Sequence, residues 1–297
     1  MSAAPYSRNG IAPKAVVLIA GLISSLAALT PAVAAPPAAA TTAAGSKTAT
    51  PPTRDLPQLL ACMRANSPTR LRGQKVTMEL REHGELMRTL RGQLYVKRDA
   101  AAGSGANGTL RANLRITEPE ALAGGSYLIT QTQDYLHSGM YVYLPSVRRV
   151  RRITGSVADG SLMGTQFSYD EFKQLQSAFG DLQATLEAPT TLDGRDVEQL
   201  LFAGAGGKDA RYDRVRAWVD RESCLPLKAE FYDGERVVKR LSAPASAIQH
   251  DGGLWYLKRI DMLDVLADAT TTLSAEPMAV TGSAAKLFDP EQFYKAP

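Results

Sequence analysis

Residues that could carry out chemistry are few and scattered along this chain of 297 residues. Ser223 and Cys224 could act as nucleophiles, but a nucleophile needs a base within hydrogen-bond reach and no histidine lies near them in sequence. Asp170 and Glu171 are adjacent, and neighbouring helical side chains diverge, so the pair does not indicate shared acid–base catalysis. The three histidines lie in separate segments: His83, His137 and His250.

The fingerprints of cofactor and metal sites are also missing from the sequence. No GxSxG, phosphate-binding loop or dinucleotide motif follows a predicted strand and begins a helix. The CxxC and HxxH spacings of zinc sites are absent. We therefore expect no cofactor, no metal and no catalytic residue, and the sequence favours binding over catalysis. A hydrolase remains a third hypothesis, because folding could bring a base to a nucleophile.

A basic cluster is the clearest candidate for binding an anionic partner, since arginine pairs bidentately with phosphate and carboxylate. It consists of Arg148, Arg149, Arg151 and Arg152. The partner would be lipid headgroups or the acidic rim of a pump or receptor. Alternatively, the cluster is a solvated strand face paired with Asp and Glu. Val147, Val150 and Ile153 recur every third residue, which fits neither a strand nor a helix, and a β-bulge would reconcile the spacing.

The chain has two cysteines, Cys62 and Cys224. In an oxidising compartment they could form a disulfide. This bond would join the first helix to a strand or turn and would stabilise the fold by roughly 4–5 kcal/mol in the chain-entropy model. The alternative is two separate buried thiols.

Alternating apolar and polar residues predict three consecutive strands at 74–82, 86–96 and 110–117, with a bend at Gly92. His83-Gly84 forms the first turn, and short connections favour an antiparallel meander. Further strands are predicted at 127–131, 140–144, 182–188, 197–203, 212–220, 227–232, 236–241, 254–263 and 270–273. Helices are predicted at 55–67 and 170–179, with a helical turn at 119–123.

About ten strands and two or three helices predict a mainly β fold. A single antiparallel sheet of this size must curl, and the helices would cover its concave face. Mobile aliphatic side chains on that face could surround an acyl chain, at roughly 0.8 kcal/mol per CH₂ removed from water. The same pattern is equally required of any packed β core. The candidate cavity residues are Met78, Leu80, Leu90, Leu94, Val96, Leu114, Ile116 and Val142.

The N-terminus has the three-part layout of a secretory signal peptide. Arg8 and Lys14 precede the apolar run 15–29, and Ala32-Val33-Ala34 predicts cleavage after Ala34. The run is shorter than the ~20 residues of a membrane anchor, which is the alternative. Leu59-Leu60-Ala61-Cys62 resembles a lipobox but lies far beyond that run. We expect a signal peptide at 1–34, a disordered lead rich in Ala, Pro and Thr at 35–54, and a single domain at 55–297.

The formal net charge of +4 is mild and evenly spread. It does not indicate nucleic-acid binding, and it fits an exported protein near anionic surfaces. We expect a soluble monomer.

Several segments in order resemble the outer-membrane lipoprotein-sorting, LolA-like family of periplasmic proteins, over about residues 70–295. The resemblance is carried by Met140–Pro145, Val147–Ile153, Met163-Gly164, Phe167–Phe172 and Trp218–Asp233. It implies an open, incomplete antiparallel β-barrel curled around helices, with a hydrophobic cavity for acyl chains. The best-known members escort lipoproteins across the periplasm. This chain looks closer to relatives associated with export pumps of the resistance-nodulation-division type.

The sequence therefore predicts a periplasmic, non-catalytic carrier. It would bind the acyl chains of a lipid or lipoprotein in an apolar cavity and pass them to a membrane partner. The main alternative is an accessory interaction subunit of an inner-membrane export pump. In that case the interior of this protein would be filled core with no ligand cavity.

Overall fold

The computed structural model describes residues 53–99, 108–131, 139–177, 179, 183–203, 211–280 and 284–295. All of them belong to one compact unit, residues 49–297. The predicted signal peptide at 1–34 and nearly all of the predicted lead at 35–54 lie outside the described residues, as does the predicted link at Asp134-Tyr135.

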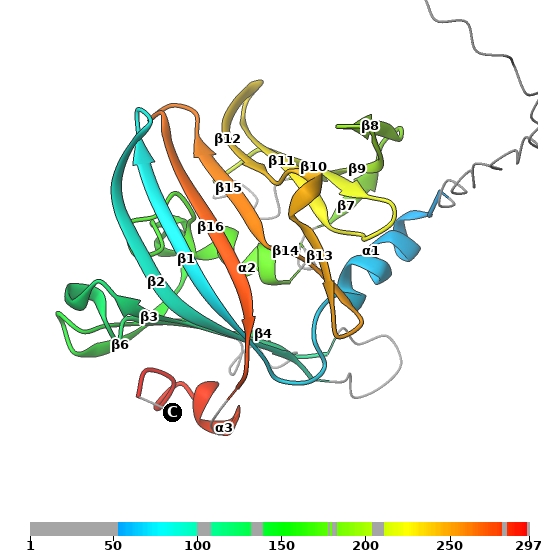
Figure 1. The fold of residues 1–297 in the computed structure, drawn as a ribbon. Coiled ribbons are helices and arrows are strands. Elements are labelled where there is room, and N and C mark those ends of the chain that lie inside the picture. The colour runs from blue at the N-terminus through cyan, green and yellow to red at the C-terminus, as the bar shows by residue number, and fades with distance from the viewer. Residues whose placement is uncertain are drawn as a thin grey trace, which may run out of the picture. The chain divides into compact units, whose positions relative to one another are not determined.

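One curled, open antiparallel sheet of 14 strands dominates the unit (Figure 1). Its order is β6-β5-β4-β3-β2-β1-β16-β15-β12-β11-β10-β9-β7, and β8 also pairs with β9. A separate hairpin pairs β13 with β14. The strands are β1 (Arg72–Glu82), β2 (Glu85–Arg98), β3 (Leu110–Glu118), β4 (Ser126–Gln131), β5 (Gly139–Leu144), β6 (Arg149–Ile153), β7 (Ala184–Leu186), β8 (Thr190–Leu192), β9 (Arg195–Ala203), β10 (Arg214–Asp220), β11 (Pro226–Asp233), β12 (Arg236–Ser242), β13 (Ile248–Asp251), β14 (Leu254–Leu257), β15 (Arg259–Asp264) and β16 (Ala269–Met278).

The predicted mainly β, antiparallel and open fold is confirmed, but the predicted count of about ten strands was too low. The described part of the chain has sixteen strands, and those that were missed have only three to five residues. Alternation cannot be recognised over so few positions. The run 254–263 was predicted as one strand, whereas Lys258 divides it: β14 turns back on β13, and β15 joins the main sheet.

The bend predicted at Gly92 is confirmed. The register of β2 against β3 shifts between Arg91 and Gly92. A Cβ atom at Gly92 would lie 2.4 Å from the carbonyl oxygen of Arg115, so the close approach of the strands requires glycine here.

The bulge proposed for the basic strand β6 is wrong, because its pairing with β5 is regular from Leu144 opposite Arg149 to Met140 opposite Ile153.

Helices α1 and α2 begin with capping boxes, in which a side chain and a backbone N–H exchange hydrogen bonds across three residues. In α1 the pair is Asp55 and Gln58, and in α2 it is Ser168 and Glu171. The helices are α1 (Leu56–Ala65), α2 (Tyr169–Gln176) and α3 (Ala284–Leu287), with 3₁₀ turns η1 (Glu120–Leu122), η2 (Gly155–Asp159) and η4 (Ala245–Ala247).

The two faces of the sheet are covered by different elements. Helix α2 lies within the curl, where Phe172 joins the main core (Figure 1). On the outer face, Phe288 and Phe293 of the C-terminal segment pack with Tyr95 and Leu128 in a second cluster. The amide of Asn113, a buried residue of that face, donates to the carbonyl oxygens of Leu287 and Phe293 at 2.8 and 3.0 Å.

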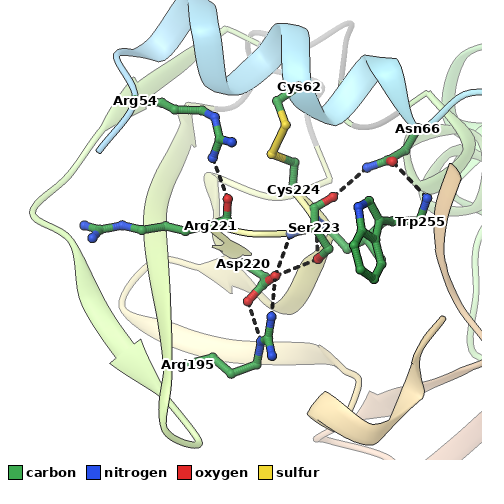
Figure 2. The surroundings of a disulfide bond; sticks show 10 residues. Arg54, Cys62, Asn66, Arg195, Asp220, Arg221, Ser223, Cys224 and Trp255 are labelled. Carbon is green, nitrogen blue, oxygen red and sulfur yellow. Dashed lines mark hydrogen bonds and ion pairs between the residues drawn. A yellow bond between two sulfur atoms is a disulfide. The ribbon is translucent and has the colours of Figure 1, made fainter. Parts of the chain in front are cut away.

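A disulfide between Cys62 and Cys224 joins α1 to the turn between β10 and β11 (Figure 2), as predicted. Its two Cα atoms lie 5.8 Å apart. Asn66 donates to the carbonyl of Ser223 at 2.7 Å, and Arg54 donates to the carbonyl of Arg221 at 2.5 Å, so α1 is held at both ends. Because Cys62 is in a disulfide, the lipobox alternative is wrong.

We expect the double variant Cys62→Ala/Cys224→Ala to unfold with a free energy about 3–5 kcal/mol lower than the parent, because the open chain gains conformational entropy. Chemical denaturation measures this loss. Adding reductant should reproduce the loss in the parent and change nothing in the variant. Thiol labelling of denatured, unreduced parent should find no free sulfhydryl, and two labelled thiols would contradict the bond.

Candidate ligand-binding site

All eight residues predicted to line a cavity lie on the inner face of the sheet. Each is buried in the main core cluster, with at most 8 % of its surface exposed. Their registers place them side by side: Met78 lies opposite Leu90 and Leu273, and Leu94 lies opposite Leu114. Their role in ligand binding stays a prediction.

Native side chains fill much of this concave face. The ring of Phe172 packs edge-on against Phe167 and Tyr127, with centroids 6.4 and 6.1 Å apart. The Tyr127 hydroxyl donates to the carbonyl of Tyr169 at 2.7 Å. Over β3 and β4 the predicted cavity is therefore occupied by α2 and the residues just before it.

Leu94 and Val96 are the two candidates that line an apolar pocket at one end of the face, which we call the α1 pocket. It has a volume of about 160 Å³ and is lined by α1, the end of α2, the β10–β11 turn, the β13–β14 hairpin and the inner face of β1, β2, β15 and β16. Its apolar wall includes Met63, Leu94, Leu175, Leu225, Leu257 and Ile260.

The α1 pocket adjoins a larger and more polar one, which we call the outer pocket. The outer pocket has a volume of about 740 Å³, and Arg70, Arg72 and Asp251 are its charged lining residues. The two pockets share Ser67, Pro68, Arg72 and Leu254.

The β13–β14 hairpin forms one wall of the α1 pocket without belonging to the main sheet. Polar contacts hold it to its neighbours. The backbone N–H of Trp255 donates to the side-chain oxygen of Asn66 at 3.1 Å (Figure 2). Arg72 pairs with the Asp251 carboxylate at 2.5 Å and lies over the ring of Tyr256, 5.3 Å from its centroid.

The volume of the α1 pocket limits what it can hold in this conformation. A dry cavity of about 150 Å³ lined by Leu, Ile and Phe binds a molecule the size of benzene. About 160 Å³ is therefore room for roughly six carbon atoms. A full-length acyl chain would need α2 or the β13–β14 hairpin to move.

A buried polar cluster attaches α2 to the sheet. The ammonium of Lys239, on β12, lies 3.0 and 3.1 Å from the carboxylate oxygens of Glu171 and donates to the carbonyl of Gln166 at 2.8 Å. The Tyr212 hydroxyl also donates to Glu171. Burial lowers the pKa of Lys239, although the Glu171 carboxylate acts in the opposite direction. Burial and the Glu171 carboxylate raise the pKa of Tyr212, which keeps its hydroxyl a donor.

The basic cluster lies on β6, an end strand of the main sheet, and in the turn before it. Arg148, Arg149, Arg151 and Arg152 are all exposed. Among the described residues, no carboxylate pairs with Arg148, Arg149 or Arg151. The threefold spacing of apolar residues arises because Val147 lies in the turn and Val150 is exposed, whereas Ile153 is buried.

The histidines that the structure describes do not meet a nucleophile. The ring of His83 lies 3.2 Å from Asp268 at the exposed tips of two hairpins, and His250 packs on Trp255. The Ser223 hydroxyl donates to the Asp220 carboxylate at 2.7 Å, and that carboxylate also forms an ion pair with Arg195 (Figure 2). His137 lies outside the described residues.

Metal-binding clusters and membrane-spanning helices are both absent from the described ranges. No group of three or more His, Cys, Asp or Glu residues there could hold a metal ion. None of the helices described is long and apolar enough to cross a membrane.

Removing one member of the Lys239–Glu171 pair should be costly, because it leaves the other buried without its partner. We expect Glu171→Gln or Lys239→Met alone to lower the free energy of unfolding by about 3–5 kcal/mol, and the double variant to lose less than the sum of the two. Urea denaturation tests this. Arg91→Gln, which breaks the exposed pair with Glu118, is the control and should cost at most about 1 kcal/mol. Additive losses would show that the pair does not act as a unit.

Comparisons with known proteins place this architecture in a family. A family model with the description "Uncharacterized protein" matches residues 108–294, and no curated protein matches. A crystal structure of a DUF1329 family protein from Desulfovibrio piger is similar at 23% identity, covering 78% of this chain and 95% of that one, with a TM-score of 0.67.

Two further crystal structures share the fold. One, of an outer membrane lipoprotein-sorting protein domain from Vibrio parahaemolyticus, is 19% identical, covers 80% of this chain and 97% of that one, and has a TM-score of 0.66. The other, of a LolA superfamily protein from Nitrosomonas europaea, is 20% identical, covers 80% and 98%, and has a TM-score of 0.59. The chain belongs to the family that the matching model describes, and its fold is that of LolA-like, outer-membrane lipoprotein-sorting structures.

Proposed function

We propose that this protein is a periplasmic carrier that binds an acyl chain of a lipid or lipoprotein in the α1 pocket and passes it to a membrane partner without chemical change. The observation that carries the proposal is the α1 pocket itself, an apolar recess that adjoins a polar pocket. The LolA-like fold supports the same class of function.

The periplasmic location rests on two observations. The first 34 residues have the pattern of a secretory signal peptide. The Cys62–Cys224 disulfide is of a kind that persists in oxidising compartments such as the bacterial periplasm.

Loading and release require the pocket to change size, because about 160 Å³ does not hold a whole acyl chain. The elements that would move are attached by discrete contacts: α2 by the Lys239–Glu171 pair and the hairpin by Arg72 and Asn66. A carrier must not bind its cargo too tightly, and a shift between two populated states would satisfy this requirement.

The second candidate function is an accessory interaction subunit of an export pump of the resistance-nodulation-division type. Two observations favour it: side chains fill much of the concave face, and β6 presents exposed arginines at a sheet edge. In that case the partner would bind the edge, and the α1 pocket would have no ligand.

Native protein purified without detergent should carry acyl species that mass spectrometry of an organic extract detects. A fluorescent fatty-acid probe should bind, and Ala275→Leu, which fills the α1 pocket, should weaken its binding about tenfold or more by steric exclusion. Ser274→Leu is the matched control, because Ser274 lies on the same strand with its side chain on the other face. A clean extract together with equal probe binding by both variants would exclude the α1 pocket as the site.

The basic strand should attract anionic membranes. We expect Arg149→Gln/Arg151→Gln to weaken binding to phosphatidylglycerol vesicles about 30-fold, since each basic residue near such a surface contributes about 1 kcal/mol. The control is Arg91→Gln/Arg236→Gln, which removes two exposed arginines that are paired with carboxylates. Cosedimentation at rising salt measures the effect. A salt-independent affinity that both double variants share would show that the cluster is only a solvated face.

A further inference from the structure

Arg72 occupies the point where the α1 pocket and the outer pocket meet, because it lines both. On β1 it shares the inner face with Gln74, Val76 and Met78, since side chains alternate along a strand. The inner face of β1 therefore changes from apolar to polar at this end. Among the residues that the structure describes, Arg72 is the only charged one that lines the α1 pocket.

The charge around this junction is unbalanced toward positive. Counting described residues, the lining of the outer pocket has two arginines, Arg70 and Arg72, and one carboxylate, Asp251. Arg70 is exposed, and no carboxylate of the described residues pairs with it. A guanidinium group at the mouth of an apolar recess is suited to an anionic head whose tail enters the recess.

The present partner of Arg72 could be replaced by such a head. Arg72 donates to the Asp251 carboxylate at 2.5 Å and to the Asp251 carbonyl at 3.0 Å. The side chain of Asp251 is 54% exposed. Ion pairs with a partner this exposed contribute little net stability, so a ligand carboxylate or phosphate can compete with Asp251 for the same guanidinium.

We propose that the α1 pocket and the outer pocket together bind a single-chain amphiphile with an anionic head, whose tail enters the α1 pocket and whose carboxylate or phosphate replaces Asp251 on Arg72. This inference rests on the proposed carrier function and adds a preference for anionic over neutral head groups. Replacing Asp251 also removes one of the contacts that hold the β13–β14 hairpin, which lines the pocket. Head-group binding thereby loosens the wall that limits the length of the tail.

The preference is tested with three probes that share one tail: dodecanoate, dodecyl phosphate and dodecanol, each below its critical micelle concentration. Calorimetry gives the affinities, and Trp255 in the pocket wall supplies a fluorescence signal. We expect the parent to bind the better of the two anions about tenfold or more tightly than dodecanol, because the head makes a charge-assisted hydrogen bond. The stronger of dodecanoate and dodecyl phosphate identifies the head group.

Two variants should change the affinity for the anionic probes in opposite directions. Arg72→Gln should bind all three probes with the affinity of dodecanol, whereas Asp251→Asn should bind the anions more tightly than the parent because the competing carboxylate is gone. Arg91→Gln, which loses an exposed and paired arginine on β2, should behave as the parent. The contrast between the two variants keeps the test valid if Arg72→Gln is unstable.

The outcomes distinguish a failure of this inference from a failure of the proposed carrier function on which it rests. Equal binding of anions and dodecanol by the parent, or weaker anion binding by Asp251→Asn, overturns the role of Arg72 and leaves the carrier function standing. Failure of all three probes to bind overturns the carrier function itself. Tight anion binding that Ala275→Leu does not weaken places the tail elsewhere and also overturns the inference.

Discussion

The structure depends on how the apolar concave face of an open sheet is covered. A closed barrel satisfies its own edges and encloses its interior, but this sheet ends at β6 and β7 and must be covered by other elements. The covering elements make no ladder of hydrogen bonds with the main sheet. They are attached at a few points: α1 by a disulfide and by Arg54 and Asn66, α2 by the buried Lys239–Glu171 pair, and the β13–β14 hairpin by Arg72 and Asn66. The sheet is thus the continuous part of the molecule, and its cover is held by a small number of specific contacts, of which the disulfide and the buried Lys239–Glu171 pair are the strong ones.

Long elements could be predicted from the sequence because their periodicity repeats many times. The strands from Arg72 to Glu118, the bend at Gly92 and the helix at 56–65 follow directly from alternation, turn residues and caps. Two cysteines leave a single possible intramolecular bond, so Cys62 and Cys224 could be predicted either to pair or to remain two separate thiols, and the structure shows the pair.

Other features could not be predicted because they depend on residues far apart in sequence. Lys239 and Glu171 are 68 positions apart, and nothing local marks a lysine on β12 as buried. Arg72 looks like an ordinary first residue of a strand, and its place between two pockets depends on a hairpin 179 residues later. The sequence placed the cavity along the whole inner face, whereas the α1 pocket lies at one end of that face and Phe167, Phe172 and Tyr169 are packed in the core beside it. Hydrophobic patterning identifies which side chains face inward, but it does not show how completely they fill the space.

The composition of the two edges of the sheet has a consequence for self-association. An unpaired strand edge is a template on which a second copy can add its own strand, and long apolar edges lead to aggregation. At one end the edge strands β7 and β8 have three residues each, which is too short to recruit a neighbour by backbone pairing. At the other end, β6 would bring the arginines of two molecules against each other, and like charges directly opposite repel. We therefore expect this open sheet to remain free of fibre growth at high protein concentration, since neither edge favours pairing with a strand of a second copy.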